Sequence, residues 1–347
     1  MSHYAHYAGK NVSVTGGASF IGSTLVEHLV EAGATVQVID DFSTGRLENL
    51  EQVAANISLV NGDLVNASVA SKAFSDFQPD IVFHLAAIHG GRGFIEKYGD
   101  RILSNVVLDQ NVFRAAVACG ASMIVHASSA CAYPIGLQEN TGDRNYLSED
   151  QAGFDLPGQA FPDGAYGWVK LFGEFQLQTI VSGTNSRGRS ARIFTAYGER
   201  ENESHAAVAL VAKSLLGYNP FPIWGNGEQT RNFTYVKDTV KGLLLIGSDL
   251  RDESFDVINV GSRQHITVND FVQSIFNEVG GVAPKLQHEL HRPVGVASRA
   301  SDNTKIKELF GWEPEIGIEV GIANLVRWYR QWESRALTQE ELDSRLV

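Results

Sequence analysis

The sequence NVSVTGGASFIGSTLVEHLVEAG at residues 11–33 joins an apolar strand to an amphipathic helix through glycines. The strand covers 11–16, and the helix covers 19–33, with apolar residues at helical spacing and a glycine stop. Glycines at such a junction let backbone N–H groups and the helix N-terminus approach a pyrophosphate. The spacing is Gly16, Ser19, Gly22, with serine where a third glycine is usual. The stretch predicts a dinucleotide-binding unit.

Strands and helices alternate over the following residues. The pattern predicts further strands at 35–40, 57–63, 80–87, 122–129 and 190–198, and helices at 104–120 and 164–181. Such alternation indicates an α/β fold built on a doubly wound parallel sheet. After 198 the pattern loosens, and it predicts loop with short strands at 219–233, a strand at 255–262, and helices at 234–248, 267–280 and 319–335.

This organisation predicts two interleaved domains. The larger covers residues 9–198, with returning segments about 231–262. A smaller C-terminal α/β substrate domain is expected from 199–230 and 263–335. Residues 1–8 are expected to form a loose tail.

Composition excludes several classes of protein. The net charge is −12, so nucleic acid is not an expected partner. The two cysteines cannot form a disulfide framework, which favours a reducing cytoplasm. No apolar run reaches 18 residues and the N-terminus lacks a signal-peptide core, so no membrane association is expected. The histidines show no metal-ligand spacing, and no metal site is predicted.

Asp40 and Asp63 end the second and third predicted strands. A carboxylate at Asp40 can bind both ribose hydroxyls and repel a 2′-phosphate, which favours NAD over NADP. The alternative is a glycine turn with a surface aspartate, and nearby Arg46 leaves NADP open. Asp63 is expected to accept from the adenine amino group, or alternatively to cap a helix.

Tyr166 and Lys170 lie one turn apart on a predicted helix. A tyrosine becomes an acid/base near neutral pH only if its pKa of about 10 is lowered, which a neighbouring lysine can do. Ser129, at the end of the strand at 122–129, would orient the substrate oxygen.

These stretches together resemble one family. The matching segments are TGGASFIG, DDFSTG, GDL, FHLAA, SSACAYP, YGWVK, GNGEQTRNFTYVKD, INVGS and DNTKIKELFGWEP. Over residues 10–330 the chain resembles extended short-chain dehydrogenases/reductases of the nucleotide-sugar epimerase/dehydratase branch. The resemblance implies a Rossmann-type fold, bound NAD, and Ser129, Tyr166 and Lys170 as the redox triad. It also implies a nucleoside-diphosphate sugar substrate, and a homodimer through a four-helix bundle from helices near 104–118 and 164–181.

The family's cofactor contacts carry over by motif. They are Gly16, Ser19, Phe20, Ile21, Gly22, Asp40, Asp63, Leu64, Leu85, Ala86, Ala87, Asn105, Tyr166 and Lys170. The expected substrate contacts are Gly91, Arg92, Gly93, Ser129, Thr195, Arg231 and Arg299. Arg231 and Arg299 suit a diphosphate because guanidinium pairs with phosphate bidentately. Thr195 and Glu199 replace an asparagine and a proline common in relatives, which puts the usual diphosphate contact of this loop in doubt.

Two stretches narrow the resemblance further. HLAAIHGGRGFI (84–95) is similar to a loop of GDP-mannose 3,5-epimerases, and SSACAYP to these and to GDP-L-fucose synthases. Both families place a carbon acid/base at the position of Cys131, and the synthases place a histidine at that of His205. The alternatives are a small buried cysteine and a surface histidine.

The resemblance implies a nucleotide-sugar epimerase acting at C3 and/or C5 through a transient 4-keto sugar. Oxidation at C4 acidifies the adjacent C–H bonds, and groups such as cysteine and histidine titrate close enough to neutrality to move those protons. Four alternatives stay open: a 4-epimerase, a 4-keto-sugar 3,5-epimerase/4-reductase, a uronic acid decarboxylase, and a non-catalytic NAD-binding regulator.

Overall fold

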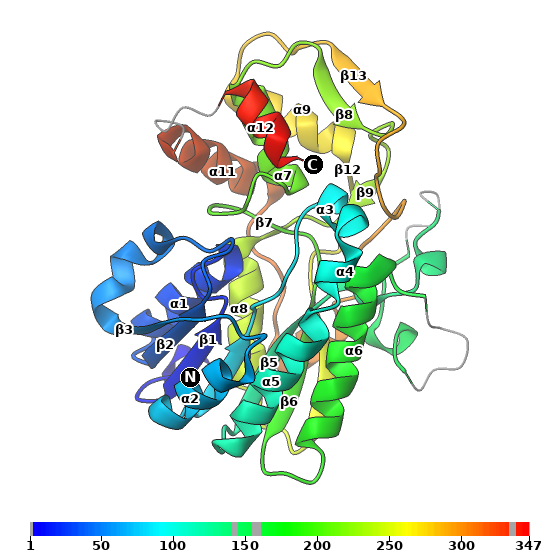
Figure 1. The fold of residues 1–347 in the computed structure, drawn as a ribbon. Helices are drawn as coiled ribbons and strands as arrows, with labels where there is room; N and C mark the ends of the chain where they lie inside the picture. Colours follow the sequence, from blue (N-terminus) through cyan, green and yellow to red (C-terminus); the bar gives the residue numbers. More distant parts are fainter. Residues whose placement is uncertain (1–2, 141–144, 155–160, 333–337, 347) are drawn as a thin grey trace.

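Seven parallel strands form one sheet in the order β11-β6-β5-β4-β1-β2-β3 in the computed structural model, which describes residues 3–140, 145–154, 161–332 and 338–346 (Figure 1). The strands are β1 (Asn11–Thr15), β2 (Thr35–Asp40), β3 (Ile57–Asn61), β4 (Ile81–His84), β5 (Met123–Ser129), β6 (Arg187–Ile193) and β11 (Phe255–Val260). The strand order reverses between β1 and β4, which opens a crevice outside their carboxyl ends. The predicted doubly wound α/β fold is confirmed.

Helices cover both faces of the sheet (Figure 1). One face packs against α1 (Phe20–Glu31) and α8 (Val236–Gly247), and the other against α2 (Ala67–Phe77), α5 (Asn105–Ala118) and α6 (Gly164–Val181). The central strands are apolar and buried on both sides, as expected for parallel strands between helical layers. The short helices α3 (Arg92–Lys97) and α4 (Gly99–Ile102) follow β4 at the carboxyl edge. Short 3₁₀ helices are η1 (His3–His6), η2 (Leu47–Asn56), η3 (Ala130–Ala132), η4 (Ile135–Leu137) and η5 (Glu149–Gln151).

A second group of elements lies beyond the carboxyl edge (Figure 1). It contains α7 (Ala206–Leu215), α9 (Val268–Val279), α11 (Ile318–Trp332), α12 (Gln339–Arg345), and the pairs β8 (Phe221–Trp224) with β13 (Leu286–Glu289) and β9 (Thr230–Arg231) with β12 (Ile266–Thr267). The stretch around α10 (Thr304–Phe310) instead returns to the sheet, where Trp312 Nε1 donates to the carbonyl of Asp238. The two-domain division stays a proposal.

The strand predicted at 190–198 is wrong at both ends. β6 starts at Arg187 and stops at Ile193, and a separate β7 (Ala196–Tyr197) pairs with β10 (Thr234–Tyr235). The strand begins with polar residues, and Arg189 among them is buried because its Nε donates to Asp249 at 2.6 Å. The helix predicted at 234–248 accordingly begins later, at Val236.

The N-terminal residues that the structure describes do not form a loose tail. Tyr7 is fully buried, and its hydroxyl donates to the carbonyl of Leu244 on α8 at 2.5 Å. A segment this short carries no periodicity that would reveal such packing.

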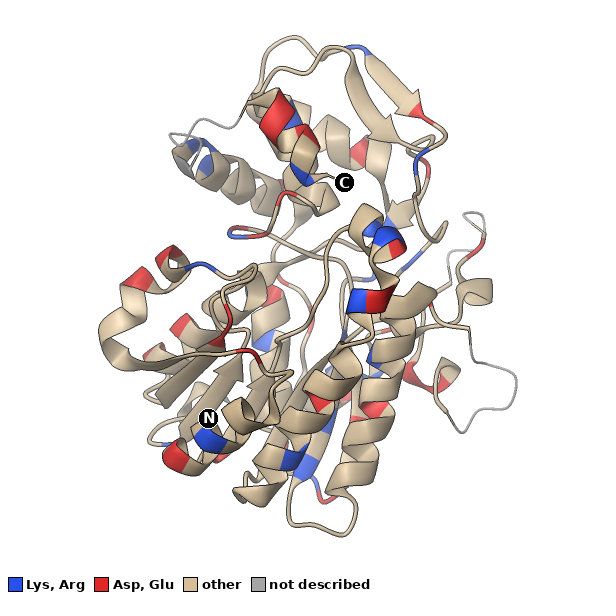
Figure 2. Cartoon of the chain, viewed as in Figure 1, with Lys and Arg blue, Asp and Glu red and all other residues tan. Residues whose placement is uncertain are grey.

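Charges of both signs are spread over the two groups of elements, although the chain is acidic overall (Figure 2). Basic residues on α3 stand close to the junction between them. Among the described residues, no helix combines the length and apolarity needed to cross a membrane.

Candidate active site

The turn between β1 and α1 is built for close approach. Gly16 has φ +68, and a Cβ there would lie 2.7 Å from the backbone nitrogen of Ala86. A Cβ at Gly22 would collide with the carbonyl of Gly16. Ser19 fits in place of the usual glycine because its hydroxyl donates to the same carbonyl at 2.6 Å. Phe20 and Ile21 form the first turn of α1 and pack on the core. The cradle therefore suits a pyrophosphate at a helix N-terminus.

Asp40 is fixed at the end of β2. Its two carboxylate oxygens accept from the backbone N–H groups of Ala18 and Phe42, both at 2.9 Å. Burial raises its pKa, and the two N–H donors oppose this. A Cβ at Gly45 would lie 2.6 Å from Oδ1, so the chain leaves the carboxylate room only because glycine stands there. This geometry fits a ribose-binding carboxylate.

Asp63 is exposed after β3 and accepts from the backbone N–H of Val65 at 2.8 Å. The alternative role as a helix cap is wrong, because Asn66 caps α2. Leu64 is buried in the core beneath. The adenine contact of Asp63 stays a prediction.

The segment after β4 is tied to its neighbours. The N–H groups of Leu85 and Ala86 donate to the carbonyl and the hydroxyl of Thr15. The amide of Asn105 exchanges two hydrogen bonds with the backbone of Ile88. Asn105 thus positions this segment, which includes the half-buried Ala87.

Ser129, Tyr166 and Lys170 come together where β5 meets α6. A Cβ at Gly167 would collide with the carbonyl of Cys131, so the start of α6 presses directly on the chain after β5. The backbone N–H of Cys131 donates to the Ser129 hydroxyl at 3.1 Å. Lys170 Nζ lies 5.7 Å from the centre of the Tyr166 ring and donates to the carbonyl of Ala127 at 2.8 Å.

The pKa of Tyr166 differs from the prediction. Burial raises it, as do the charges of Cys131 and Asp109. Burial lowers the pKa of Lys170. The lysine ammonium is directed to a backbone carbonyl, so in this state of the protein it does not lower the tyrosine's pKa.

A buried chain of polar side chains runs beneath the triad. Thr15 Oγ1 lies 2.7 Å from His84 Nδ1, and His84 Nε2 lies 3.0 Å from Asp109 Oδ1. His126 is also buried, and burial lowers its pKa to about 3. These residues link the glycine turn to the carboxylate whose charge acts on Tyr166 and Lys170.

Cys131 stands on a wall of the site that is rich in arginine. Arg299 donates to Cys131 Sγ at 3.3 Å, to Gln138 Oε1 at 2.6 Å and to Asp163 Oδ2 at 3.1 Å. Arg92 donates twice to Asp163 Oδ1, at 2.9 and 3.0 Å. Burial would raise the pKa of Asp163, but the two guanidinium groups hold it below its usual value.

Arg231 completes this wall. Its guanidinium donates to the carbonyls of Thr230 and Val294 at 2.7 and 2.8 Å. Burial lowers its pKa, and so do the charges of Arg299 and Arg92. Arg92 and Arg299 share the carboxylate of Asp163, while Arg231 is bonded only to backbone carbonyls and lies within range of their charges. The positive charge of this wall suits an anionic ligand. Thr195 lies half-buried beyond β6, where its carbonyl accepts from the N–H of Thr234.

His205 stands on a second wall of the site, beside His89. It precedes α7, and its ring centre lies 5.5 Å from that of His89, which lies 6.4 Å from the ring of Tyr166. A Cβ at Gly91 would collide with the carbonyl of Ser204, so only glycine lets the two loops meet; Gly93 follows in α3. Burial lowers the pKa of His205 to about 4 and that of His89 to about 3.

Four site residues were missed by sequence reasoning: His89, Gln138, Asp163 and Glu201. His89 lies inside a recognised motif, and Asp163 stands just before the helix of Tyr166, so both could have been suspected. Gln138 carried no signal, because only folding brings it to Arg299. Glu201 lies four residues before His205, and that spacing could have pointed to it.

Comparison with known proteins shows which family has this arrangement of residues. Residues 12–261 match the model of the NAD dependent epimerase/dehydratase family. The chain belongs to this family. It is therefore an enzyme that uses NAD, and the glycine turn and Asp40 provide the features that this dinucleotide requires.

Relatives in the family differ in activity. The chain is 30% identical to GDP-mannose 3,5-epimerase 1 of Oryza sativa subsp. indica, over 94% of this chain and 84% of the relative. It is also 30% identical to UDP-glucose 4-epimerase of Mycolicibacterium smegmatis, over 91% and 97%. The structure of UDP-glucuronic acid 4-epimerase from Bacillus cereus with UDP-glucuronic acid and NAD matches with a TM-score of 0.80 and 26% identity, covering 93% and 99%.

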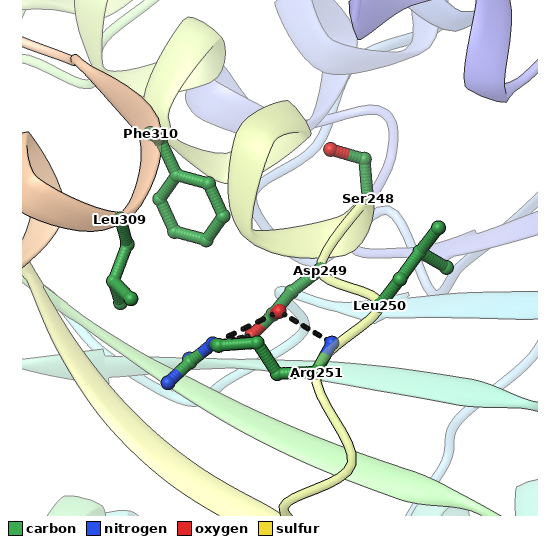
Figure 3. Close-up of a pocket in the computed structure, with 6 residues that line it drawn as sticks. All are labelled: Ser248, Asp249, Leu250, Arg251, Leu309 and Phe310. Carbon is green, nitrogen blue, oxygen red and sulfur yellow. Dashed lines mark hydrogen bonds and ion pairs between the residues drawn. The ribbon is translucent and has the colours of Figure 1, made fainter.

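A pocket of about 420 Å³ lies away from this site, next to the segment that leads from α8 into the start of β11. Its lining includes Asp249, Leu250 and Phe310 (Figure 3). The carboxylate of Asp249 is already paired with Arg189 and Arg251. None of the triad lines this pocket.

Proposed function

We propose that the enzyme is a nucleotide-sugar epimerase that inverts C3 and/or C5 of the sugar through a transient 4-keto intermediate. The observation that carries the proposal is the position of Cys131 and His205. Cys131 lies two residues after the triad serine, and its charge acts on Tyr166. His205 reaches the same tyrosine from another element through the ring of His89.

Ser129, Tyr166 and Lys170 would carry out the redox step. Ser129 would orient the C4 hydroxyl, and Tyr166 would take its proton as a phenolate. Lys170, which donates to the carbonyl of Ala127 in this structure, would turn towards the phenol and stabilise that charge, and it would also hold the cofactor. NAD held beside the triad would supply the acceptor for the hydride from C4 and the donor for its return. Gly16, Ser19, Gly22 and Asp40 would hold its pyrophosphate and ribose.

Cys131 and His205 would move the carbon-bound protons. With a ketone at C4, one group removes a proton from the adjacent carbon, and the other delivers a proton to the opposite face. Arg299 fixes the sulfur through its hydrogen bond and would hold it in a reactive orientation.

The arginine wall supports a nucleoside-diphosphate sugar as the substrate. Arg92 and Arg299 are paired with Asp163, Arg231 has no carboxylate in contact among the described residues, and a diphosphate would balance its charge. The relatives that match most of the chain include enzymes named for GDP-sugars and enzymes named for UDP-sugars. The nucleotide of the substrate therefore stays open.

Exchange of substrate hydrogen with solvent tests the proposal. We expect wild-type protein to incorporate deuterium from D2O at C3 or C5 of its nucleotide sugar, and Cys131→Ala to lose it by at least about 100-fold. Cys119→Ala is the matched control, because that thiol donates to the carbonyl of Ala116 at the end of α5, away from the triad. Undiminished exchange in Cys131→Ala contradicts the proposal.

A 4-epimerase is the second candidate, favoured by the complete triad and by the 4-epimerase relatives. It would interconvert C4 epimers without any deuterium at C3 or C5. A 4-keto-sugar epimerase/reductase would instead consume reduced cofactor stoichiometrically.

We also propose a homodimer through α5 and α6. Both helices expose apolar side chains, with Leu103 and Val107 near the first and Trp168 and Phe175 on the second. Apolar side chains gathered on neighbouring helices are typical of an interface. The molecular mass in solution tests this pairing.

A further inference from the structure

Glu201 is a buried carboxyl group beside His205, four residues earlier in the chain. Its side chain is 5% exposed, and Oε1 lies 3.6 Å from His205 Nδ1. Oε2 is buried and has no hydrogen-bond partner among the described residues. A buried carboxyl oxygen without a partner is costly unless the group is neutral or gains a partner during function.

We propose that Glu201 is a positioning residue that holds Nδ1 of His205 and supplies the proton that the histidine passes to the substrate. The proposal rests on the proposed function, because it concerns the second acid/base of that reaction. The separation of 3.6 Å is longer than a hydrogen bond and would close in the substrate complex, as catalytic contacts often do.

The orientation of the imidazole follows from this contact. The two ring nitrogens lie on opposite sides, so a partner at Nδ1 leaves Nε2 to face the substrate. His89 packs edge-on against the same ring, with an interplanar angle of 79°, and limits its rotation. The histidine is thus held from two directions.

The charge states explain why a single histidine is insufficient. Burial raises the pKa of Glu201 well above its usual value and lowers that of His205 to about 4. Burial therefore favours the neutral form of both groups. A neutral imidazole that gave up its proton alone would become an imidazolate, which is too basic to form readily near neutral pH.

A coupled transfer avoids that state. As the enediolate is protonated, the Nε2–H bond of His205 breaks and the new C–H bond forms. Nδ1 takes the carboxyl proton of Glu201 in the same step, so the negative charge moves from the sugar to the Glu201 carboxylate. Proton removal from the sugar runs these transfers in reverse.

Glu201→Gln distinguishes the two roles proposed for Glu201, which are to orient the His205 ring and to supply it with a proton. The glutamine amide can still donate a hydrogen bond to Nδ1, but it cannot release a proton. We expect inversion with deuterium incorporation to fall at least about tenfold at each carbon that the enzyme inverts, while reduction of bound cofactor continues. His205→Gln should affect the same carbons.

Glu203→Gln is the matched control. Glu203 is a buried carboxylate in the same loop, but it pairs with Arg345 on α12 at 3.1 Å. This variant should exchange at the wild-type rate at both carbons. Thermal unfolding shows whether each variant is folded, and Glu201→Asp, which keeps the carboxyl, should exchange faster than Glu201→Gln.

The outcomes separate the two proposals. Wild-type protein that exchanges at neither carbon overturns the proposed function. Wild-type exchange that is unchanged in Glu201→Gln, or lost equally in Glu201→Asp and Glu201→Gln, overturns the role of Glu201 alone. The double variant that combines Glu201→Gln with His205→Gln should exchange deuterium no more slowly than His205→Gln alone, because Glu201 acts only through His205.

Discussion

Two walls of the site, one with Cys131 and one with His205, approach Tyr166. They differ in whether their titratable groups are ionised or neutral. On the Cys131 wall, Arg92 and Arg299 are paired with the ionised carboxylate of Asp163. On the His205 wall, burial favours the neutral forms of His89 and His205 and the protonated form of Glu201. One wall suits binding of an anionic substrate, and the other suits storage and transfer of protons.

The difference has a physical cause in the neighbours of each group. Asp163 is buried, but two guanidinium groups outweigh the cost of its burial. Glu201 is equally buried and receives only a backbone hydrogen bond from Gly198, so its neutral form prevails. Burial alone therefore does not fix the charge of a carboxyl group; the nearest cations decide it.

Tyr166 is the group that the two walls share, so its loss should have the largest effect. We expect Tyr166→Phe to lower turnover by about 10²–10⁴-fold, because no phenol remains to take the C4 proton. Deuterium exchange at both carbons should fall equally, since each needs the ketone. The measurement is turnover together with NMR of the product formed in D2O. NAD binding should persist, and exchange that survived at either carbon would contradict the shared role.

Asp163→Asn should disrupt the ion pairs on the wall that carries Cys131 and leave the wall that carries His205 unchanged. Removing the charge leaves the buried Arg299 without its carboxylate and Arg92 with Glu96 alone, and we expect a loss of about 3 kcal/mol in the free energy of unfolding at neutral pH. The pKa of Asp163 is depressed on folding, so its stabilisation is present above the unfolded pKa of about 3.9 and is lost as pH falls through the folded value. Urea unfolding of both proteins at several pH values measures this. A gap that stayed constant below pH ~4 would contradict it.

His205→Gln should have a smaller effect on stability, confined to a higher pH window. Below pH ~6.5 the unfolded chain binds a proton that the folded ring accepts only near pH 4. As the pH falls between those two values, the free energy of unfolding of the wild-type protein should therefore drop by about 1 kcal/mol relative to the variant. The drop is smaller than the full pKa shift would give, because the ring is 30% exposed to solvent. The groups facing this ring are Glu201 and His89. Equal acid sensitivity of the two proteins would show that His205 is protonated in the folded state.

Much of the fold could be predicted because its signals are local. The helix at 164–181 and the strand at 35–40 have the predicted bounds, since each carries its own periodicity and a clear stop. The prediction was wrong for 190–198, where buried arginines resemble surface residues until their partners are known. It was also wrong for the N-terminal tail, which is held by the distant α8.

The sequence by itself determined the sheet, the glycine cradle, Asp40 and the pairing of Tyr166 with Lys170, because each depends on residues near one another in the chain. Only the tertiary structure decided the two walls. Arg299 reaches Cys131 and Asp163 across more than a hundred residues, and His89 meets His205 because two loops cross at Gly91. Charge states follow from such contacts, since burial and the nearest opposite charge together set whether a group is ionised.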